Sequence, residues 1–296
     1  MRFHRFFCLS VFLLLFSAFG IGQMRWVAAQ PVIPMYSAPS VDADVVSQAI
    51  YGTTVQQQAP PKDQATAPEG WIYIKTPDDY PGWVQRNLFL PLDTKENYAG
   101  KDKHVIVVAN RGANVYRETD VTAHAPLLTL PFETALEETG VEGKRWHKIR
   151  LVDGREAWIQ TGDTQERPAK PLTIDEMIAL GKKFLGVTYT WGGTSSFGYD
   201  CSGFTQMLMR EHGVLMPRDA DIQAAWNGVA AVDRKDLKPG DLLYFGGSAE
   251  KITHTGMYIG NGEFIHDTTH DHPMVQISKL DDQPWTKLLV ACRRPK

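Results

Sequence analysis

Cysteine is scarce in this chain, with three residues among 296: Cys8, Cys201 and Cys292. No two of them have the C-x-x-C spacing that is typical of cysteine-based zinc sites. Cys8 falls within the first apolar segment. In an oxidising compartment Cys201 and Cys292 could form one disulfide. The alternative is that Cys201 is a reactive thiol and that Cys292, in L-L-V-A-C-R-R, is a buried apolar residue of a final strand.

An excess of positive charge is also absent. Lysine and arginine total 31 against 34 acidic residues, a formal net charge of −3. Loss of the first 23 residues, which include Arg2 and Arg5, would lower this to −5. An acidic surface gives no bulk electrostatic attraction for nucleic acid, so nucleic acid is not expected as a partner.

The chain has one long apolar run, from Phe6 to Phe16, which is shorter than the ~20 residues of a membrane-spanning helix. Basic residues precede it and small residues follow it. This pattern predicts a cleaved secretory signal peptide over residues 1–23, and therefore export to the periplasm, cell surface or medium. An uncleaved membrane anchor is the alternative. After cleavage we expect no stable membrane insertion.

An internal repeat follows this segment. W-I-Y-I-K at 71–75 and W-H-K-I-R at 146–150 each come twelve residues before a second tryptophan, from Trp71 to Trp83 and from Trp146 to Trp158. Short alternating strands with turn signals between them predict two small all-β barrels. The repeats resemble bacterial SH3-like domains, which are common in exported cell-wall proteins. We place these domains at residues 31–95 and 102–165.

The last segment, residues 171–296, has a different pattern. R-P-A-K-P forms a stiff linker, and T-I-D-E is a capping box that predicts a helix from Thr173 to about Gly186. In that helix Ile174, Met177, Ile178 and Leu185 are expected on the buried face. Two further helices and about five apolar strands follow. We therefore expect an α+β domain in which helices pack on an antiparallel sheet.

Cys201 begins the second of these helices, in Y-T-W-G-G-T-S-S-F-G-Y-D-C-S-G-F-T (189–205). Unpaired N–H groups and the helix dipole at such a position favour a thiolate, so we expect a nucleophile. Phe204, Met207 and Leu208 would form the buried face of the helix. Gly203 would allow close approach of a ligand or a neighbouring chain.

Two histidines flank a predicted hairpin turn, G-N-G. His254 opens one strand, His266 closes the next, and the turn lies midway between them. Both side chains should therefore lie near the same end of adjacent strands, within about 5–8 Å. We assign His254 as the base for Cys201 and His266 as its orienting partner. A zinc site formed by His254, His266, His270 and His272 is the alternative. We expect no metal and no cofactor.

D-C-S-G-F, H-T-G-M-Y-I-G and F-I-H, in this order, resemble the NlpC-type cysteine peptidases, bacterial cell-wall hydrolases with a papain-like core. Y-T-W-G-G and K-P-G-D-L-L-Y-F agree with the same family. With two SH3-like domains ahead of the core, the chain is similar to the γ-D-glutamyl-L-diamino-acid endopeptidases. These enzymes cut the peptidoglycan stem peptide after D-glutamate, in fragments with a free N-terminal L-alanine. The resemblance implies stem peptides or murein fragments as the substrate and indicates no oligomeric state.

The resemblance also implies roles for individual residues. Cys201 would attack the carbonyl, and its backbone N–H would help to hold the oxyanion. The expected substrate-binding residues are Tyr80 from the first SH3-like domain and Tyr189, Trp191, Asp200, Ser202 and Asp219. Asp42 or Asp44 could join Tyr80 in holding the substrate amine. Ala220 stands where the family often has a hydroxyl residue, which puts one pocket hydrogen bond in doubt.

Other interpretations of these residues remain. Asp219 could cap the following helix and pair with Arg218. The papain-like core could be inactive and bind the wall, or act as an amidase or acyltransferase on another amide.

Overall fold

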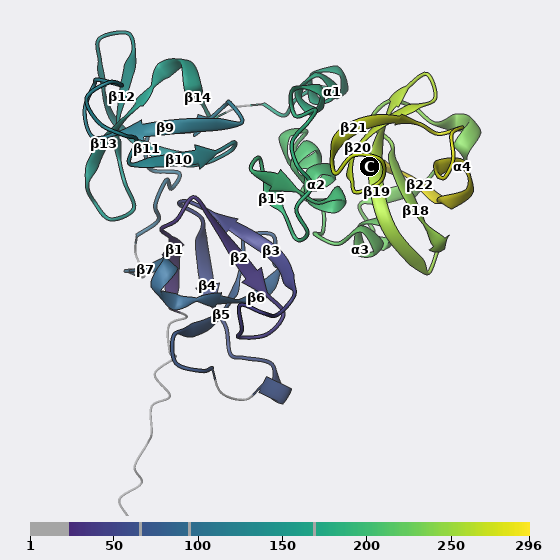
Figure 1. Ribbon diagram of the computed structural model, residues 1–296, viewed down its shortest axis with the longest axis horizontal. Coiled ribbons are helices and arrows are strands. Elements are labelled where there is room, and N and C mark those ends of the chain that lie inside the picture. Colours follow the sequence, from purple (N-terminus) through teal and green to yellow (C-terminus); the bar gives the residue numbers. More distant parts are fainter. Residues whose placement is uncertain (1–23, 65–66, 94–95, 168–169) are drawn as a thin grey trace, which may run out of the picture.

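The structure, a computed structural model, describes residues 24–296 except 65–66, 94–95 and 168–169. The predicted signal peptide lies outside the described residues. Three units follow one another along the chain (Figure 1): two built from strands and a third in which helices cover an antiparallel sheet. Among the described residues no helix is long and apolar enough to cross a membrane.

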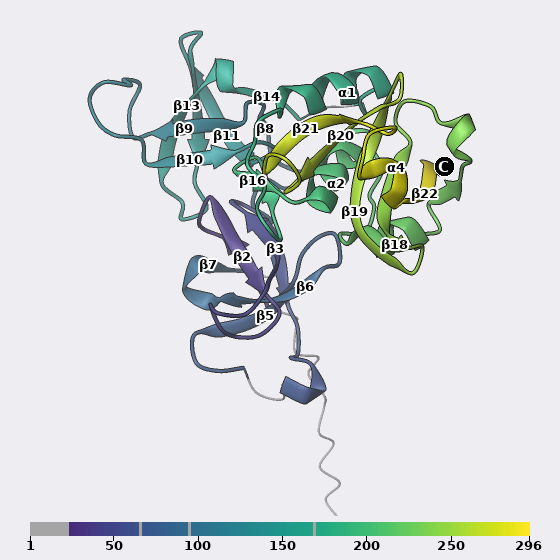
Figure 2. The ribbon, with the colours of Figure 1, turned by 45° about the vertical axis from the view of Figure 1, so that its right-hand side comes forward.

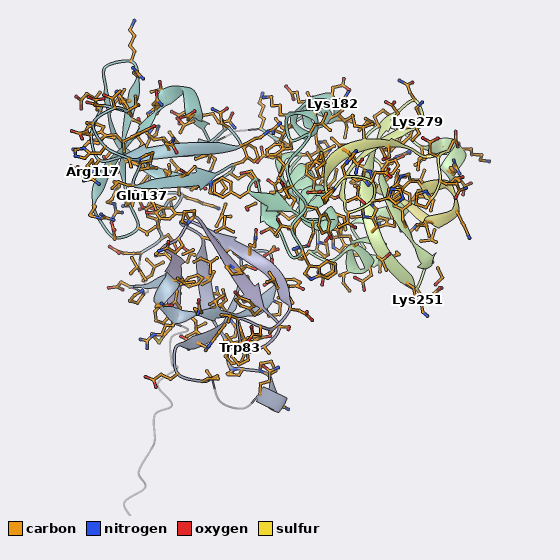
Figure 3. All side chains as sticks on the ribbon, in the orientation of Figure 1. Trp83, Arg117, Glu137, Lys182, Lys251 and Lys279 are labelled. Carbon is orange, nitrogen blue, oxygen red and sulfur yellow. The ribbon has the colours of Figure 1, made fainter. Side chains whose placement is uncertain are left out.

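The first β unit is a seven-stranded sheet in the order β3-β2-β6-β5-β4-β1-β7. Its strands are β1 (Arg25–Ala28), β2 (Val32–Tyr36), β3 (Val45–Ile50), β4 (Thr54–Gln57), β5 (Trp71–Lys75), β6 (Pro81–Gln85) and β7 (Phe89–Leu92), with short 3₁₀ helices at Lys62–Gln64 and Arg86–Leu88. Trp83, labelled in Figure 3, is fully buried and donates its ring N–H to Gln64 Oε1 at 2.7 Å. The unit begins at β1, before the predicted boundary at residue 31.

The second β unit repeats this topology strand for strand, with the order β10-β9-β13-β12-β11-β8-β14. Its strands are β8 (Val105–Val108), β9 (Gly112–Tyr116), β10 (Leu128–Pro131), β11 (Ala135–Glu142), β12 (Trp146–Arg150), β13 (Glu156–Gln160) and β14 (Thr164–Glu166). β12 corresponds to β5 and β13 to β6, so the paired tryptophans occupy matching strands. The internal repeat seen in the sequence is therefore a repeat of the fold.

The third unit has helices α1 (Ile174–Lys183), α2 (Cys201–Glu211), α3 (Ala220–Ala225) and α4 (Trp285–Leu288). Its strands are β15 (Thr194–Ser195), β16 (Gly198–Tyr199), β17 (Val229–Ala231), β18 (Leu242–Ser248), β19 (Lys251–Gly260), β20 (Glu263–Thr268), β21 (Met274–Lys279) and β22 (Leu289–Pro295). The main sheet has the order β17-β22-β18-β19-β20-β21, six strands instead of the expected five. The additional strand, β17, is three residues of G-V-A-A that carry no alternating pattern.

Helix α1 confirms its predicted start and corrects its predicted end. Thr173 and Glu176 form both hydrogen bonds of the capping box. The helix ends at Lys183, and Leu185, which was expected on the buried face, is 37% exposed. Met177 and Ile178 are buried as predicted, and Leu180 adds to the apolar contact. Leu185 was misassigned because it was counted as a further helical position, whereas the chain has already left the helix.

Helix α2 is buried along nearly its whole length, from Cys201 to Met209. It packs against β19 and β20 and lies on the side of the third unit that faces the β units (Figure 2). Arg210 near its end forms two hydrogen bonds with the Glu133 carboxylate of the second β unit, at 2.6 and 2.8 Å. Arg111 of that unit donates to the carbonyls of Lys183 and Leu185, just after α1. These polar contacts join the second β unit to the end of α2 and to the end of α1.

Gly203 allows the backbone approach that was expected of it. A Cβ at this position would lie 2.1 Å from the carbonyl oxygen of Gly193, in the loop that precedes α2. That oxygen also accepts the backbone N–H of Asp200 at 3.1 Å. The start of α2 can therefore hold this loop only because residue 203 has no side chain.

We predict that Gly203→Ala lowers the free energy of unfolding by about 2 kcal/mol, although alanine is the better helix former, because the new methyl group would displace backbone. Urea unfolding measures the change. Gly247→Ala is the matched control, since a Cβ there meets no atom within 4 Å. Equal stabilities of the two variants would contradict this account of the packing.

Candidate active site

Cys201 is the first residue of α2, and Asp200 is its N-cap. The Asp200 carboxylate accepts the backbone N–H of Gly203 at 2.7 Å. Such a cap satisfies one of the free N–H groups at a helix start and fixes the direction in which the helix leaves the loop. The Cys201 side chain is consequently held at a defined place, with 8% of the residue exposed.

The thiol faces strand β19. The backbone N–H of Thr255, the residue after His254, donates a hydrogen bond to the Cys201 sulfur. Cys201 and Cys292 are both free, so the structure contains no disulfide between them. Cys292 lies in β22 and packs with Leu243 and Phe245, which confirms its interpretation as a buried apolar residue.

The two histidines meet as the hairpin predicted. β19 and β20 pair through Met257 and Ile265, and His254 Nε2 lies 2.8 Å from His266 Nδ1. His266 Nε2 lies 3.0 Å from the Ser278 hydroxyl on β21. Both nitrogens of His266 are therefore engaged in hydrogen bonds. In a zinc site built on His266 and the loop histidines, one ring nitrogen of His266 would bind the ion instead of a side chain.

This chain of hydrogen bonds is compatible with the histidine tautomer that a base for the thiol requires. If His254 donates from Nε2, then His266 accepts at Nδ1 and donates from Nε2 to the hydroxyl of Ser278. Nδ1 of His254 then carries a free lone pair, which is the form that a base for the thiol requires. Ser278 was not among the predicted site residues. Its only sequence signal is the alternation in M-V-Q-I-S.

An aromatic wall surrounds the histidine pair. The Trp285 ring lies 5.2 Å from the His254 ring and 4.8 Å from the His266 ring, and Phe245 lies 5.6 Å from His254. Burial in this setting lowers the pKa of His254 to about 3 and that of His266 well below its usual range. The imidazoles are thus kept neutral at physiological pH.

The surroundings of the thiol work against the expected thiolate. Burial, followed by the negative charge of Asp200, raises the pKa of Cys201 to about 12, and the Thr255 backbone N–H and the Arg218 charge oppose this only in part. Desolvation therefore opposes the effect of the helix start on the thiol, and the thiolate stays a prediction.

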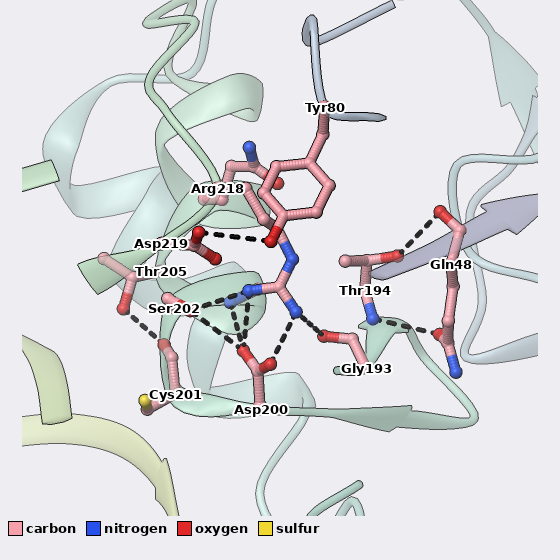
Figure 4. Close-up of polar contacts among 12 residues, drawn as sticks. Gln48, Tyr80, Gly193, Thr194, Asp200, Cys201, Ser202, Thr205, Arg218 and Asp219 are labelled. Atoms are coloured by element: carbon pink, nitrogen blue, oxygen red, sulfur yellow. Dashed lines mark hydrogen bonds and ion pairs between the residues drawn. The ribbon is translucent and has the colours of Figure 1, made fainter. Parts of the chain in front are cut away.

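Asp200 and Ser202 are tied to Arg218 (Figure 4). Arg218 Nη1 donates to Asp200 Oδ1 at 3.0 Å and to Ser202 Oγ at 2.7 Å, and its other terminal nitrogen forms an ion pair with Asp200 Oδ2. Arg218 is 2% exposed. The suggestion that Arg218 pairs with Asp219 is wrong, because this guanidinium is occupied by Asp200. Arg218 is thus the partner of both Asp200 and Ser202, the residues on either side of Cys201 in the chain.

Asp219 meets the first β unit instead. Tyr80, in the turn before β6, donates its hydroxyl to Asp219 Oδ2 at 3.1 Å, as Figure 4 shows. Asp219 occupies the N-cap position of α3 but forms no side-chain capping bond. Partial burial raises the pKa of this carboxyl, while the nearby Arg218 charge and the Tyr80 hydrogen bond lower it. At this junction, therefore, the Asp219 carboxylate accepts a hydrogen bond from the uncharged hydroxyl of Tyr80.

Tyr189 and Trp191 have different surroundings. Tyr189 is half-buried, and burial is the main cause that raises the pKa of its hydroxyl. Trp191 is 69% exposed. Its part in a pocket wall stays a prediction.

Asp267 is a further acidic side chain that sequence reasoning missed. It is fully buried beside His266 in the chain, and neither carboxylate oxygen has a hydrogen-bonding partner of standard geometry among the described residues. Burial, and after it the charge of Asp200, raises the pKa of Asp267 to about 8. The group is thus protonated at neutral pH.

Comparisons with known proteins agree with this site. The NlpC/P60 family model matches residues 186–294, and a model described as the bacterial dipeptidyl-peptidase SH3 domain matches residues 35–87. A γ-D-glutamyl-L-lysine dipeptidyl-peptidase of Bacillus subtilis is 32% identical over 243 residues, which cover 77% of this chain and 76% of the relative. The chain belongs to the NlpC/P60 family. It is therefore a cysteine peptidase of the cell-wall type, and its first β unit includes an SH3 domain.

Two Bacillus cereus proteins extend the comparison. One, also named γ-D-glutamyl-L-lysine dipeptidyl-peptidase, is 31% identical over 223 residues, covering 73% of this chain and just under two thirds, 65%, of the relative. The other is an NlpC/P60 family protein of known crystal structure, with a TM-score of 0.76 at 24% identity over 92% of this chain and 99% of that one. This likeness shows that the fold of all three units is shared.

We predict that Asp267→Asn stabilises the protein increasingly as the pH rises from about 4 to about 8. The unfolded carboxyl ionises near pH ~4, whereas the folded one holds its proton to about pH 8. Between these values the unfolded state binds fewer protons, so wild-type stability falls with rising pH. Asparagine removes that loss, by about 2–4 kcal/mol at pH 8.

Urea unfolding at pH 4 and pH 8 tests this. Asp282→Asn, an exposed position in the same unit, is the control and should change stability equally at both pH values. A pH-independent effect of Asp267→Asn would show that the buried carboxyl is not protonated in the folded protein.

Proposed function

We propose that this protein is an exported cysteine endopeptidase of peptidoglycan stem peptides. It hydrolyses the bond between γ-D-glutamate and the L-diamino acid, diaminopimelate or lysine, and requires a free N-terminal L-alanine. The observation that carries the proposal is the Tyr80–Asp219 junction beside the nucleophile. The two relatives named γ-D-glutamyl-L-lysine dipeptidyl-peptidase support the choice of bond.

The chemistry follows from the hydrogen-bond chain. Cys201 Sγ attacks the γ-glutamyl carbonyl while its proton passes to Nδ1 of His254, and the backbone N–H of Cys201 helps to hold the oxyanion. His266, held in turn by Ser278, stabilises the imidazolium that forms. The proton then goes to the leaving amine of the diamino acid. Water cleaves the resulting thioester and restores the thiol.

The requirement for a free amine follows from the charges near Cys201. Asp200 is neutralised by Arg218, whereas among the described residues Asp219 is hydrogen-bonded only to the neutral hydroxyl of Tyr80. Asp219 is thus the carboxylate left for a substrate ammonium, which needs a negative partner when it leaves water. Tyr80 covers this carboxylate from the first β unit. We infer that it closes the pocket two residues before the scissile bond.

The rest of the predicted site is arranged around this pocket. We propose that Tyr189, Trp191, Asp200 and Ser202 line it on the side of the third unit. Of the two further acidic candidates for the amine, Asp44 is favoured over Asp42. It directly precedes Val45, whose backbone lies against Gly192 of the loop before α2.

We also propose the domain organisation that the sequence predicted. Residues 1–23 would be the signal peptide that exports the protein, with SH3-like domains at about 31–95 and 102–165 and the peptidase at 171–296. The identical strand order of the two β units supports a second SH3-like domain. The first domain would extend back to β1. Its proposed role is to limit the length of the substrate through Tyr80.

We predict that the reduced protein releases the diamino acid from L-Ala-γ-D-Glu-L-diaminopimelate or L-Ala-γ-D-Glu-L-lysine, and that Cys201→Ala abolishes release. Mass spectrometry of the products gives the bond that is cut. No turnover of either peptide by freshly reduced protein would contradict the proposal and favour a wall-binding protein. Cleavage elsewhere, or transfer of the acyl group to an added amine, would indicate an amidase or acyltransferase.

We predict that N-acetylation of the alanine lowers kcat/KM at least about 100-fold, because the acetyl group removes the charge that pairs with Asp219 and occupies the space under Tyr80. In Asp219→Asn most of this preference should disappear, with the loss falling on the free-amine substrate. Tyr36→Phe, in the same β unit as Tyr80, is the control and should keep the preference. Equal wild-type rates on blocked and free peptides would refute the closed pocket.

A further inference from the structure

A cluster of histidine and glutamate side chains lies in the second β unit, outside the proposed active site. His104 directly precedes β8, Glu138 is on β11 and Glu166 ends β14. β11 and β14 are the two neighbours of β8 in the sheet, so the three side chains come from three adjacent strands. The Glu138 backbone N–H donates to the His104 carbonyl at 3.0 Å, which holds the first two in register.

The potential ligand atoms of these residues converge. His104 Nδ1 lies 2.5 Å from Glu138 Oε2, and His104 Nε2 lies 3.3 Å from Glu166 Oε2. One ligand atom from each of the three residues falls within 4.8 Å of the others. A zinc ion bound at ~2.0–2.2 Å holds tetrahedral ligand atoms about 3.3–3.6 Å apart, so side-chain rotations must bring one nitrogen of His104 and one oxygen of each glutamate closer together.

Glu138 is the most buried of the three side chains in the cluster. Its side chain is 5% exposed, and within the part of the chain that the structure describes both of its ion pairs are with histidines, His104 and His147. The preceding residue, Glu137, differs because Arg150 neutralises it. A divalent cation would supply the positive charge that stabilises a buried carboxylate.

We propose that His104, Glu138 and Glu166 bind a divalent transition-metal ion, for which Zn²⁺ is the probe, with water completing the coordination. One imidazole and two carboxylates favour zinc-like ions over calcium or magnesium, which take oxygen ligands. His147 Nδ1 lies 2.5 Å from Glu138 Oε1, the other oxygen of the same carboxylate. His147 thus orients the ligand without touching the metal, as is usual around such sites. The bound ion would link β8, β11 and β14.

The experiment uses the full chain with Cys201→Ala, so that the active-site thiol cannot bind the added metal. Equilibrium dialysis against micromolar Zn²⁺ should find about one ion per chain, and Zn²⁺ should raise the melting temperature by about 4 °C or more. Glu166→Gln and His104→Gln should each weaken binding at least about 10-fold. Glu166 is largely exposed, so its variant tests the site even if loss of His104 disturbs folding.

The matched control is His124→Gln. His124 and Glu118 form an exposed pair in the same β unit, outside the cluster, and this variant should bind Zn²⁺ as the parent does. Absence of bound Zn²⁺ in the parent would overturn the proposal and leave the cluster as ion pairs only. Undiminished binding in both Glu166→Gln and His104→Gln would overturn it as well, because the ion would then lie elsewhere.

Discussion

The buried ion pair between Asp200 and Arg218 is the interaction on which the active site depends. The same carboxylate caps α2 through the Gly203 N–H and accepts the hydroxyl of Ser202, so one side chain holds both the helix start and the residue that follows Cys201. Removing either partner would leave an unpaired buried charge, at a cost of about 3–5 kcal/mol. The position of Cys201 and the electrostatics around it are therefore set by one contact.

The carboxyl groups of Asp200, Asp219 and Asp267 differ in what balances or removes their negative charge. Asp200 is ionised against Arg218, Asp219 has the neutral hydroxyl of Tyr80, and Asp267 keeps its proton because it is buried close to Asp200. The pKa of the Cys201 thiol is raised by burial and by the charge of Asp200. The proposed transfer of its proton to His254 therefore requires no preformed thiolate.

Local sequence patterns predicted the parts of the site that come from neighbouring elements. The G-N-G turn placed His254 beside His266, and the position of Cys201 at a helix start was correct. Burial is a tertiary property, however, so the local pattern around Cys201 could not predict the desolvation that raises the pKa of its thiol. Ser278 and Asp267 escaped notice because a single polar residue in an apolar strand carries no periodic signal.

Contacts between the units were even harder to predict from local sequence patterns. Tyr80 and Asp219 are 139 positions apart, and only the family resemblance brought them together in advance. Arg218 was considered as a partner of Asp219, because the two are adjacent in sequence, whereas the fold turns its guanidinium back to α2. Arg218 pairs with Asp200 because of the way the loop before α3 packs on the start of α2. The spacing of residues in the sequence does not predict such packing.

The turn that carries Tyr80 shows why the first β unit belongs to the site. Asp79 has a φ of 65°, a conformation that aspartate tolerates better than most residues, and Thr76 bonds to Tyr80 across the turn. Asp78 of the same turn accepts the side-chain amide of Gln206 in α2 at 3.1 Å. The turn is therefore fixed to the helix that carries the nucleophile. Through this link and the Tyr80–Asp219 hydrogen bond, one turn of the first β unit contacts both α2 and the residue that precedes α3.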